Sequence, residues 1–474
     1  MSYISTLIKR MRGSRRVFAW LVAIAFFMQM LDGTILNTAL PTIAFSLDAD
    51  PLRMQSVVIS YMLTVAFLIP VSGWLADFFG TKRVFITAIF IFTLGSLCCA
   101  LSNTLWQLVL SRILQGVGGA LMVPVGRLAL MRVFPKAELV SILSFITIPA
   151  LVGPLVGPFV GGVIVQYVSW HWIFLINLPI GVICAVLTYL AMPKVAPFKV
   201  RFDWLGYFLF SASIILISLS LENVEESTLG LKASLLMFVA GALFLGAYAR
   251  FSIARPWKAL FKPRLFYDRS FTVGIIANLF LRFGGGAVPF LTPLLLQTAL
   301  GYSPLRSGLT MVPLGIMSIL AKTFVESILN HFGYRRFLAY NTIFMGFLLS
   351  MFAFIGNNTP YGLILVLLGC LGVVNSMQFT ALNTLTLISV PQRDLSQANS
   401  LLSATMQISM SLGIAIASAA LAFFGAHNTE IRSDGMLYAF HATFVFMGVY
   451  TMLGSILFMS PFSKNIVDKP KNIK

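Results

Sequence analysis

Two residues of opposite charge lie deep inside apolar segments of this chain. Of the 15 acidic residues, only Asp32 falls well within a long apolar run, and Arg112 falls within another. A carboxylate at bilayer depth is costly, so it is retained mainly where it pairs with a cation, binds an ion or relays a proton. Burial raises a carboxylate's proton affinity and a neighbouring guanidinium lowers it, so a rearrangement between them loads or releases a proton.

The positions of these two residues along their segments predict a similar depth in a membrane. Asp32 follows the expected start of the first apolar segment by about fifteen residues, or roughly 22 Å at 1.5 Å per residue. Arg112 follows the outer start of the fourth segment by about seven residues, or roughly 10 Å, in a hydrocarbon core about 30 Å thick. We therefore expect an ion pair in which each group compensates the other's desolvation. The alternative to proton coupling is a fixed pair that only orients helices.

Composition indicates what must position such a pair. The chain has 474 residues, of which 58% are hydrophobic and 10% charged, with a mean hydropathy of +0.91. A soluble domain is about a quarter charged, and repeated apolar runs of this length predict membrane-spanning helices. We predict an all-α membrane protein with fourteen transmembrane helices. A β-barrel would need short alternating strands, which the sequence lacks.

The net charge of +18 is distributed unevenly over the expected loops. Of the 33 Lys and Arg residues, the loops assigned to the outer side contain only Arg53, Lys232, Arg306 and Arg432. Basic loops stay on the cytoplasmic side of a membrane, so this asymmetry predicts that both termini are cytoplasmic. It also argues against nucleic acid as a partner, because the basic residues are then needed to face the anionic leaflet.

The chain divides into two comparable halves. We expect six-helix bundles at 17–192 and 271–460, a two-helix insert with a basic cytoplasmic linker at 193–270, and cytoplasmic tails at 1–16 and 461–474. Short repeats relate the halves, at equivalent places in each. Phe79–Arg83 matches Phe332–Arg336, and Val140–Ser144 matches Asn399–Ser403. Such duplication is typical of transporters that rock two bundles around a central site.

Four motifs occur in order along the first half, at Leu31–Pro41, Gly73–Arg83, Arg112–Ala120 and Gly153–Gly162. Together they resemble the major facilitator superfamily, and more narrowly its 14-span drug:proton antiporter family. Trp170–Pro179 is a further match, with His171 where most relatives have Arg. The resemblance covers the whole chain. It implies a multi-pass protein of a bacterial inner membrane, a monomer among lipids, that exports amphiphilic small molecules or drugs in exchange for protons.

The resemblance assigns roles to further residues. A cytoplasmic gate is implied for Gly73, Asp77, Gly80, Lys82, Arg83 and Arg127. Asp77 is expected to contact Arg127 or the positive end of a helix in the other half. An antiporter motif is implied for Gly153, Gly157, Pro158, Gly161 and Gly162. Glycines at every fourth position put small residues on one helix face, which lets a neighbouring helix approach closely.

Other polar residues in the apolar segments are candidates for a substrate cavity. They are Gln29, Asn37, Gln115, Asn278, Arg282, Asn375 and Gln378. Arg282 lies mid-segment and must face a cavity or a partner; Asp32, a substrate anion or backbone carbonyls all remain open. Each amide is also a candidate for a plain hydrogen bond between helices. Lys322 and Glu326, four residues apart, are expected to pair.

The sequence contains no signature of an enzyme. It has no phosphate-binding loop, paired catalytic carboxylates or metal cluster, so we expect no cofactor and no metal, and an ATP-driven pump is disfavoured. Two alternatives to export remain open: a proton-coupled importer of a small metabolite on the same fold, and a non-transporting membrane sensor or scaffold. The proton, an amphiphilic small molecule and membrane lipid are the expected partners.

Overall fold

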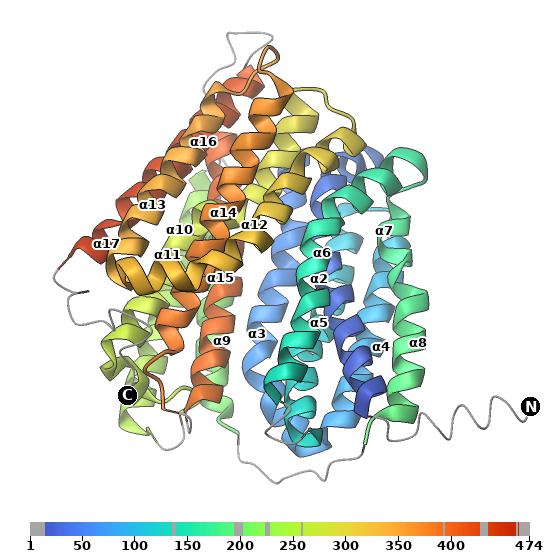
Figure 1. The fold of residues 1–474 in the computed structure, drawn as a ribbon, viewed down its shortest axis with the longest axis vertical. Helices are drawn as coiled ribbons and strands as arrows, with labels where there is room; N and C mark the ends of the chain where they lie inside the picture. Colours follow the sequence, from blue (N-terminus) through green and yellow to red (C-terminus); the bar gives the residue numbers. More distant parts are fainter. Residues whose placement is uncertain are drawn as a thin grey trace, which may run out of the picture. The chain divides into compact units, whose positions relative to one another are not determined.

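The computed structural model describes residues 15–134, 139–193, 202–222, 228–256, 259–391, 394–426, 435–460 and 463. Throughout these ranges the secondary structure is helical, with no strand (Figure 1). The chain forms two compact units, Met1–Phe202 and Asp203–Lys474, called here the first and second units. The expected tails lie largely outside the described residues.

The first unit is built from six long helical segments. They are α2 (Arg15–Ser46), α3 (Gln55–Phe79), α4 (Thr81–Ala100), α5 (Leu105–Val133), α6 (Leu139–Tyr167) and the consecutive helices α7 (His171–Leu175) and α8 (Asn177–Ala191), with a short 3-10 turn, η1 (Pro51–Met54), before α3.

The second unit contains the insert and the second set of long helices. The insert is α9 (Trp204–Glu222) and α10 (Thr228–Ala254), followed by the 3-10 turn η3 (Pro263–Tyr267). The long helices are α11 (Arg269–Leu294), α12 (Pro304–Phe332), α13 (Tyr334–Ser350), α14 (Tyr361–Leu387), α15 (Leu395–Ala426) and α16 (Gly435–Gly454), with short turns η4 (Leu295–Ala299) and η5 (Met351–Phe354) and a last short helix, α17 (Ile456–Met459).

Twelve helices in the described part of the chain are long and apolar enough to cross a membrane, rather than the predicted fourteen. The two expected spans that fall short are α6 and α9. Their described apolar stretches, Val156–Tyr167 and Trp204–Ser220, are shorter than the others. Each stretch is only part of its helix, because α6 begins at Leu139 and α9 ends at Glu222, and the twelve spans are those of the described residues alone.

The two units repeat the same set of helix contacts, as the predicted duplication requires. In the first unit α2 packs against α6, α3 against α5, and α4 against α5 and α8; in the second, α11 packs against α15, α12 against α14, and α13 against α14 and α16. Gly80 and Gly333, equivalent in the predicted repeat, both separate consecutive helices with a positive φ, of 88° and 75°. Only glycine adopts such a φ at little cost. The insert helix α9 packs on α10 and α15 of the second unit.

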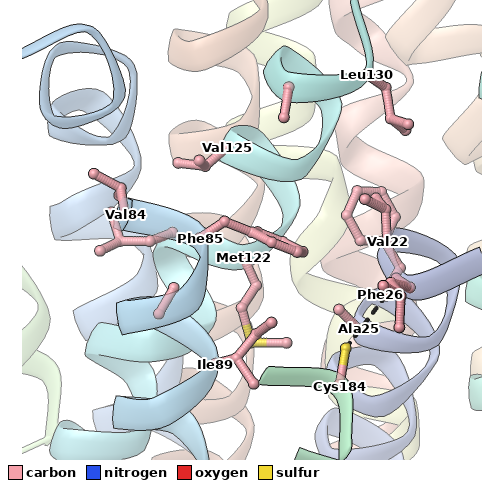
Figure 2. Packing of buried hydrophobic residues seen from close by; sticks show 14 of the residues in the cluster. Val22, Ala25, Phe26, Val84, Phe85, Ile89, Met122, Val125, Leu130 and Cys184 are labelled. Carbon is pink, nitrogen blue, oxygen red and sulfur yellow. Dashed lines mark hydrogen bonds between the residues drawn. The ribbon is translucent and has the colours of Figure 1, made fainter. Parts of the chain in front are cut away.

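A continuous apolar core holds the first unit together (Figure 2). Phe26 of α2, Phe85 and Ile89 of α4, Met122 of α5 and Cys184 of α8 all belong to it and are fully buried. Between helices in lipid, close packing rather than expulsion of water supplies the attraction. This core fixes α2, α4, α5 and α8 against one another, and these four helices also carry the charged site described next.

Candidate functional site

Asp32 and Arg112 form the predicted ion pair. Arg112 Nη1 on α5 donates to Asp32 Oδ2 on α2 at 2.6 Å. Their side chains are 1% and 0% exposed respectively, so the pair is sealed from solvent. A buried pair is stable only if further hydrogen bonds satisfy its remaining polar atoms.

Two side-chain amides complete the environment of the carboxylate. Gln115 Nε2 donates to Asp32 Oδ1 at 2.8 Å, and Asn177 Nδ2 donates to the same oxygen at 3.1 Å. Both amides also donate to Ser96 Oγ, at 2.6 and 3.2 Å. We call Asp32, Ser96, Arg112, Gln115 and Asn177 the Asp32 network. It joins α2, α4, α5 and α8, and every member is at most 1% exposed.

Arg112 also has partners that bear no charge. Its Nη1 donates to Gln115 Oε1 at 2.6 Å, and its Nε donates to the Val57 carbonyl of α3 at 3.4 Å. The guanidinium lies 4.2 Å from the centre of the Tyr61 ring, also on α3, which adds a cation–π attraction. These contacts involve neutral groups and so do not depend on the charge of Asp32.

Sequence reasoning did not identify Ser96, Asn177, Val57 or Tyr61 as part of this site. Asn177 lies inside the Trp170–Pro179 motif, so an isolated amide in that apolar run was a usable signal. Val57 contributes only its backbone, which no side-chain pattern reveals. The close contact that brings Ser96 into reach depends on Gly95, where an added Cβ would lie 2.5 Å from the Gln115 Cα.

The glycines of the antiporter motif pack against the turn of α2 that carries Asp32. A Cβ added at Gly153 would lie 2.8 Å from the Leu31 backbone nitrogen, and one at Gly157 would lie 3.1 Å from the Ile35 nitrogen. A Cβ at Gly161 would meet the Ile35 carbonyl oxygen. All three backbones touch the helix on either side of Asp32. Gly162 is buried as well, and Pro158 is partly buried.

The gate motif forms an ion pair, but with a different arginine from the one expected. Asp77, near the end of α3, accepts a hydrogen bond from Arg132 in the last turn of α5. Arg127 instead places its guanidinium 5.8 Å from the centre of the Phe26 ring. Five residues of helix put the two arginines about 140° apart around α5, so they occupy different faces. The expected Asp77–Arg127 contact was wrong.

The basic residues of the gate motif also have defined places. Lys82 Nζ donates to the Met192 carbonyl at the end of α8 at 2.7 Å, and Arg335, its counterpart in the second unit, donates to the Phe458 carbonyl at 2.8 Å. A cation at a helix C-terminus satisfies free carbonyls and the helix dipole. Arg83 is exposed, and Gly73 is an exposed residue within α3 with no atom within 4 Å of an added Cβ.

Comparison with known proteins identifies the family. The model of the Major Facilitator Superfamily matches residues 22–414. This chain belongs to the major facilitator superfamily. It is therefore a secondary transporter and not an enzyme, and a multi-pass membrane protein.

Its curated relatives include proteins named "Putative multidrug resistance protein MdtD". The one from Serratia proteamaculans (strain 568) is 44% identical over 439 residues, covering 93% of this chain and 92% of the relative. The one from Salmonella paratyphi A is 44% identical with 93% of each covered. Among solved structures, a POT family peptide transporter matches with a TM-score of 0.69 at 14% identity, over 96% of this chain and 98% of that one. A D-xylose-proton symporter matches with a TM-score of 0.65 at 14% identity, over 97% and 99%. At these identities the structures show the fold alone.

The second unit of this transporter has its own intramembrane cation. Arg282, on α11, donates from Nε to Asn278 Oδ1 at 2.8 Å and from Nη2 to Asn383 Oδ1 on α14 at 3.1 Å. Its guanidinium lies 4.1 Å from the centre of the Phe379 ring. Arg282 takes no part in the four ion pairs found among the described residues, so its hydrogen-bonding partners there are neutral.

The other cavity candidates of this transporter are divided by burial. Gln115, Asn278 and Gln378 are buried and bonded to other helices; Asn278 Nδ2 donates to Thr386 at 3.2 Å, and Gln378 Nε2 donates to Thr342 at 2.8 Å. Gln29 and Asn37 are each 7% exposed, and the side-chain oxygen of each accepts no hydrogen bond. Asn375 is partly exposed.

One further expected contact is absent from the described residues. Lys322 and Glu326 have the right spacing on α12 but do not lie within ion-pair distance, and Glu326 is exposed. An i,i+4 pair gains only a few tenths of a kcal/mol, so the spacing alone does not require the two side chains to meet.

Proposed function

We propose that this transporter is a proton-coupled antiporter that exports amphiphilic small molecules or drugs by alternating access. In this proposal it has fourteen spans, α6 and α9 included, and lies in a bacterial inner membrane with both termini in the cytoplasm. The resistance proteins that it resembles support the substrate class. The observation that carries the proposal is the sealed pair of Asp32 and Arg112, each 1% exposed.

Proton loading at Asp32 follows from the hydrogen bonds around it. The carboxylate accepts three N–H groups, two on Oδ1 and one on Oδ2. A proton on Oδ2 replaces the Arg112 contact, because a neutral carboxylic acid no longer compensates the guanidinium. Arg112 then depends on Gln115, the Val57 carbonyl and the Tyr61 ring. Since Asp32 is sealed, a proton reaches it only after these helices rearrange, and that rearrangement is the proposed coupling step.

The glycines of α6 give this step a mechanical consequence. Gly153, Gly157 and Gly161 touch the backbone of α2 on both sides of Asp32, so a shift of that turn moves α6 as well. The Asp77–Arg132 pair ties α3 to α5 at the other end and would hold the first unit together as a rigid body. We assign these residues to the transmission of the movement and not to substrate binding.

The test is proton movement in inverted membrane vesicles. With an imposed pH gradient, an exported amphiphile should be taken up by the vesicles and dissipate the gradient, followed with a pH-sensitive dye. Asp32→Asn should abolish uphill uptake while the protein still inserts and folds. Asp48→Asn is the matched control, because Asp48 is exposed and has a φ of 49°, a conformation that asparagine adopts readily.

Each other outcome has a distinct meaning. Full uptake by Asp32→Asn would remove Asp32 from the coupling step. Uptake driven only by the opposite gradient would mean an importer. An unaltered cellular phenotype in a variant that transports nothing would indicate a sensor or scaffold.

A further inference from the structure

Arg282 is held in one orientation, and no anion among the described residues pairs with it. Two of its nitrogens are fixed by Asn278 and Asn383, and its flat face lies on Phe379. Nη1 makes no hydrogen bond among the described residues, and the side chain is partly exposed. Arg282 lies about thirteen residues into α11, or roughly 20 Å along the helix. A cation at that depth is expected to face a partner or a water-filled space.

The charges available in the apolar segments favour an anion over a cation. Asp32 is the single acidic residue deep in such a segment, and Arg112 and two amides already occupy it. A cationic substrate would therefore have no free carboxylate to pair with at this depth. Within the part of the chain that the structure describes, the charge of Arg282 has no ion-pair partner, and the positive excess increases by one when Asp32 takes up a proton.

The geometry around Arg282 suits one particular ligand shape. A guanidinium with Nη1 free presents N–H donors in a plane, which matches the two oxygens of a carboxylate or sulfonate. Phe379 is 39% exposed, so an apolar surface lies beside the charge. The three glycines that follow Arg282 offer no space of their own, since added Cβ atoms at Gly285 and Gly286 would meet Met345 and Met410.

We propose that Arg282, held by Asn278 and Asn383 over Phe379, is the anion subsite of this transporter, and that its substrates are amphiphiles with a carboxylate or sulfonate group. This inference rests on the proposed function and names its substrate class. Asn383 keeps the subsite positively charged because it is neutral. Its oxygen accepts the hydrogen bond from Arg282, and its amide nitrogen makes no hydrogen bond among the described residues. An aspartate there would keep the acceptor and neutralise the cation.

Binding of three matched probes to the protein in lipid nanodiscs tests the subsite. The probes are 1-pyrenebutyrate, 1-pyrenebutanol and (1-pyrenebutyl)trimethylammonium, which share one apolar body and differ in charge. Energy transfer from tryptophan to pyrene reports binding, with empty nanodiscs subtracted. The wild-type protein should bind the anion at least about tenfold more tightly than the cation, as expected for one charge-assisted contact. Arg282→Gln should remove this preference, Arg282→Lys should keep part of it, and Asn383→Asp should shift it toward the cation.

Arg306→Gln is the control for loss of one positive charge, because Arg306 is exposed and stacks on Tyr302 with its guanidinium 4.0 Å from the ring centre. Equal affinity for anion and cation in the wild type, binding of none of the probes, or an unchanged preference in Arg282→Gln would each overturn the subsite. Asp32→Asn separates the two proposals. If that variant keeps the anion preference and also keeps uphill transport, the coupling role fails and the subsite stands.

Discussion

The two units stabilise a buried or partly buried arginine in different ways. Both place an arginine between an equivalent pair of helices, α2 and α5 in the first unit and α11 and α14 in the second. In the first unit a carboxylate neutralises Arg112 inside a fully buried network. In the second, the described hydrogen-bond partners of Arg282 are two amide oxygens, a phenylalanine ring lies against the guanidinium, and the side chain is partly exposed. The duplicated helices therefore carry one group that can exchange a proton, the Asp32 carboxylate, and one that keeps its charge, the Arg282 guanidinium. On the proposals above, coupling and recognition are divided between the units.

Breaking the Asp32–Arg112 pair should have the largest effect. Arg112→Gln leaves the Asp32 carboxylate buried without a cation, which costs about 3–5 kcal/mol. The double variant Asp32→Asn with Arg112→Gln removes both charges and should recover most of this loss, although it should not transport uphill. Thermal unfolding followed with a thiol-reactive dye measures both, because Cys99 and Cys184 are buried until the protein unfolds. A single variant as stable as the wild type would mean that the pair is not sealed.

Filling the glycine contact beside Asp32 should have the next largest effect. Gly157→Ala puts a Cβ against the Thr34 hydroxyl and 3.1 Å from the Ile35 nitrogen, and overpacking of this kind costs about 1–3 kcal/mol. Gly413→Ala tests the equivalent helix pair of the second unit, where the Cβ would lie 2.7 Å from the Phe283 carbonyl oxygen. If the units differ as proposed, only Gly157→Ala should also slow proton-coupled uptake. Gly33→Ala, with no atom within 4 Å of the added Cβ, is the neutral control.

The sequence predicted the charged pair because depth follows directly from helix rise. Counting residues from each segment end brought Asp32 and Arg112 to one level, and the structure confirms their contact. The direction in which a side chain points around its helix was harder to predict. Arg127 and Arg132 lie close together in the sequence, and only packing decides which one faces Asp77. Asn177 was missed because nothing in the Trp170–Pro179 motif indicates that its amide reaches Asp32, which lies about 145 residues earlier in the chain. The predicted Lys322–Glu326 pair was wrong, because i,i+4 spacing brings two side chains near each other but adds only a few tenths of a kcal/mol.

The partners of Arg282 could not be predicted from the sequence for a different reason. Its sequence position indicated an intramembrane cation but left three kinds of partner open. The structure supplies Asn278, Asn383 and Phe379, two of which come from α14, about a hundred residues further along the chain. Long-range neighbours of this kind depend on how α11 and α14 pack, which no local pattern encodes.

A third ionic cluster, outside the apolar spans, should respond to pH. Asp394, just before α15, accepts hydrogen bonds from Arg264 at 2.6 and 2.7 Å and from Lys262 at 3.0 Å. These hydrogen bonds, of which the one from Arg264 contributes most, lower the pKa of Asp394 below its ordinary value. A lowered folded pKa stabilises the protein above the unfolded carboxyl value, about 4, and this contribution disappears as the pH falls through the folded pKa.

Arg264→Gln should therefore lower the unfolding temperature slightly near pH 7, and the difference from the wild type should shrink below about pH 4. Arg264 is 44% exposed, so high salt should also reduce the difference. Arg336→Gln, at an exposed residue with no ion pair among the described residues, is the control. A difference that stays constant from pH 7 to pH 3 would mean that Arg264 acts through packing and not through Asp394. Unlike the sealed pair of the first unit, this cluster combines a buried carboxylate with two cations that water reaches, Lys262 and Arg264.

The effect of Arg282 on stability should be smaller than that of Arg112, and this difference tests the contrast between the two units. Arg282→Gln removes a cation that no carboxylate among the described residues compensates, so it leaves no buried charge behind. The loss should be that of the hydrogen bonds to Asn278 and Asn383, about 0.5–1.5 kcal/mol each. The same unfolding assay compares it with Arg112→Gln. A loss as large as that of Arg112→Gln would mean that Arg282 has a structural anion partner in the folded protein. A smaller loss is what the proposed subsite requires, because a cation at this depth without a structural anion faces a partner or a water-filled space, where a ligand can reach it.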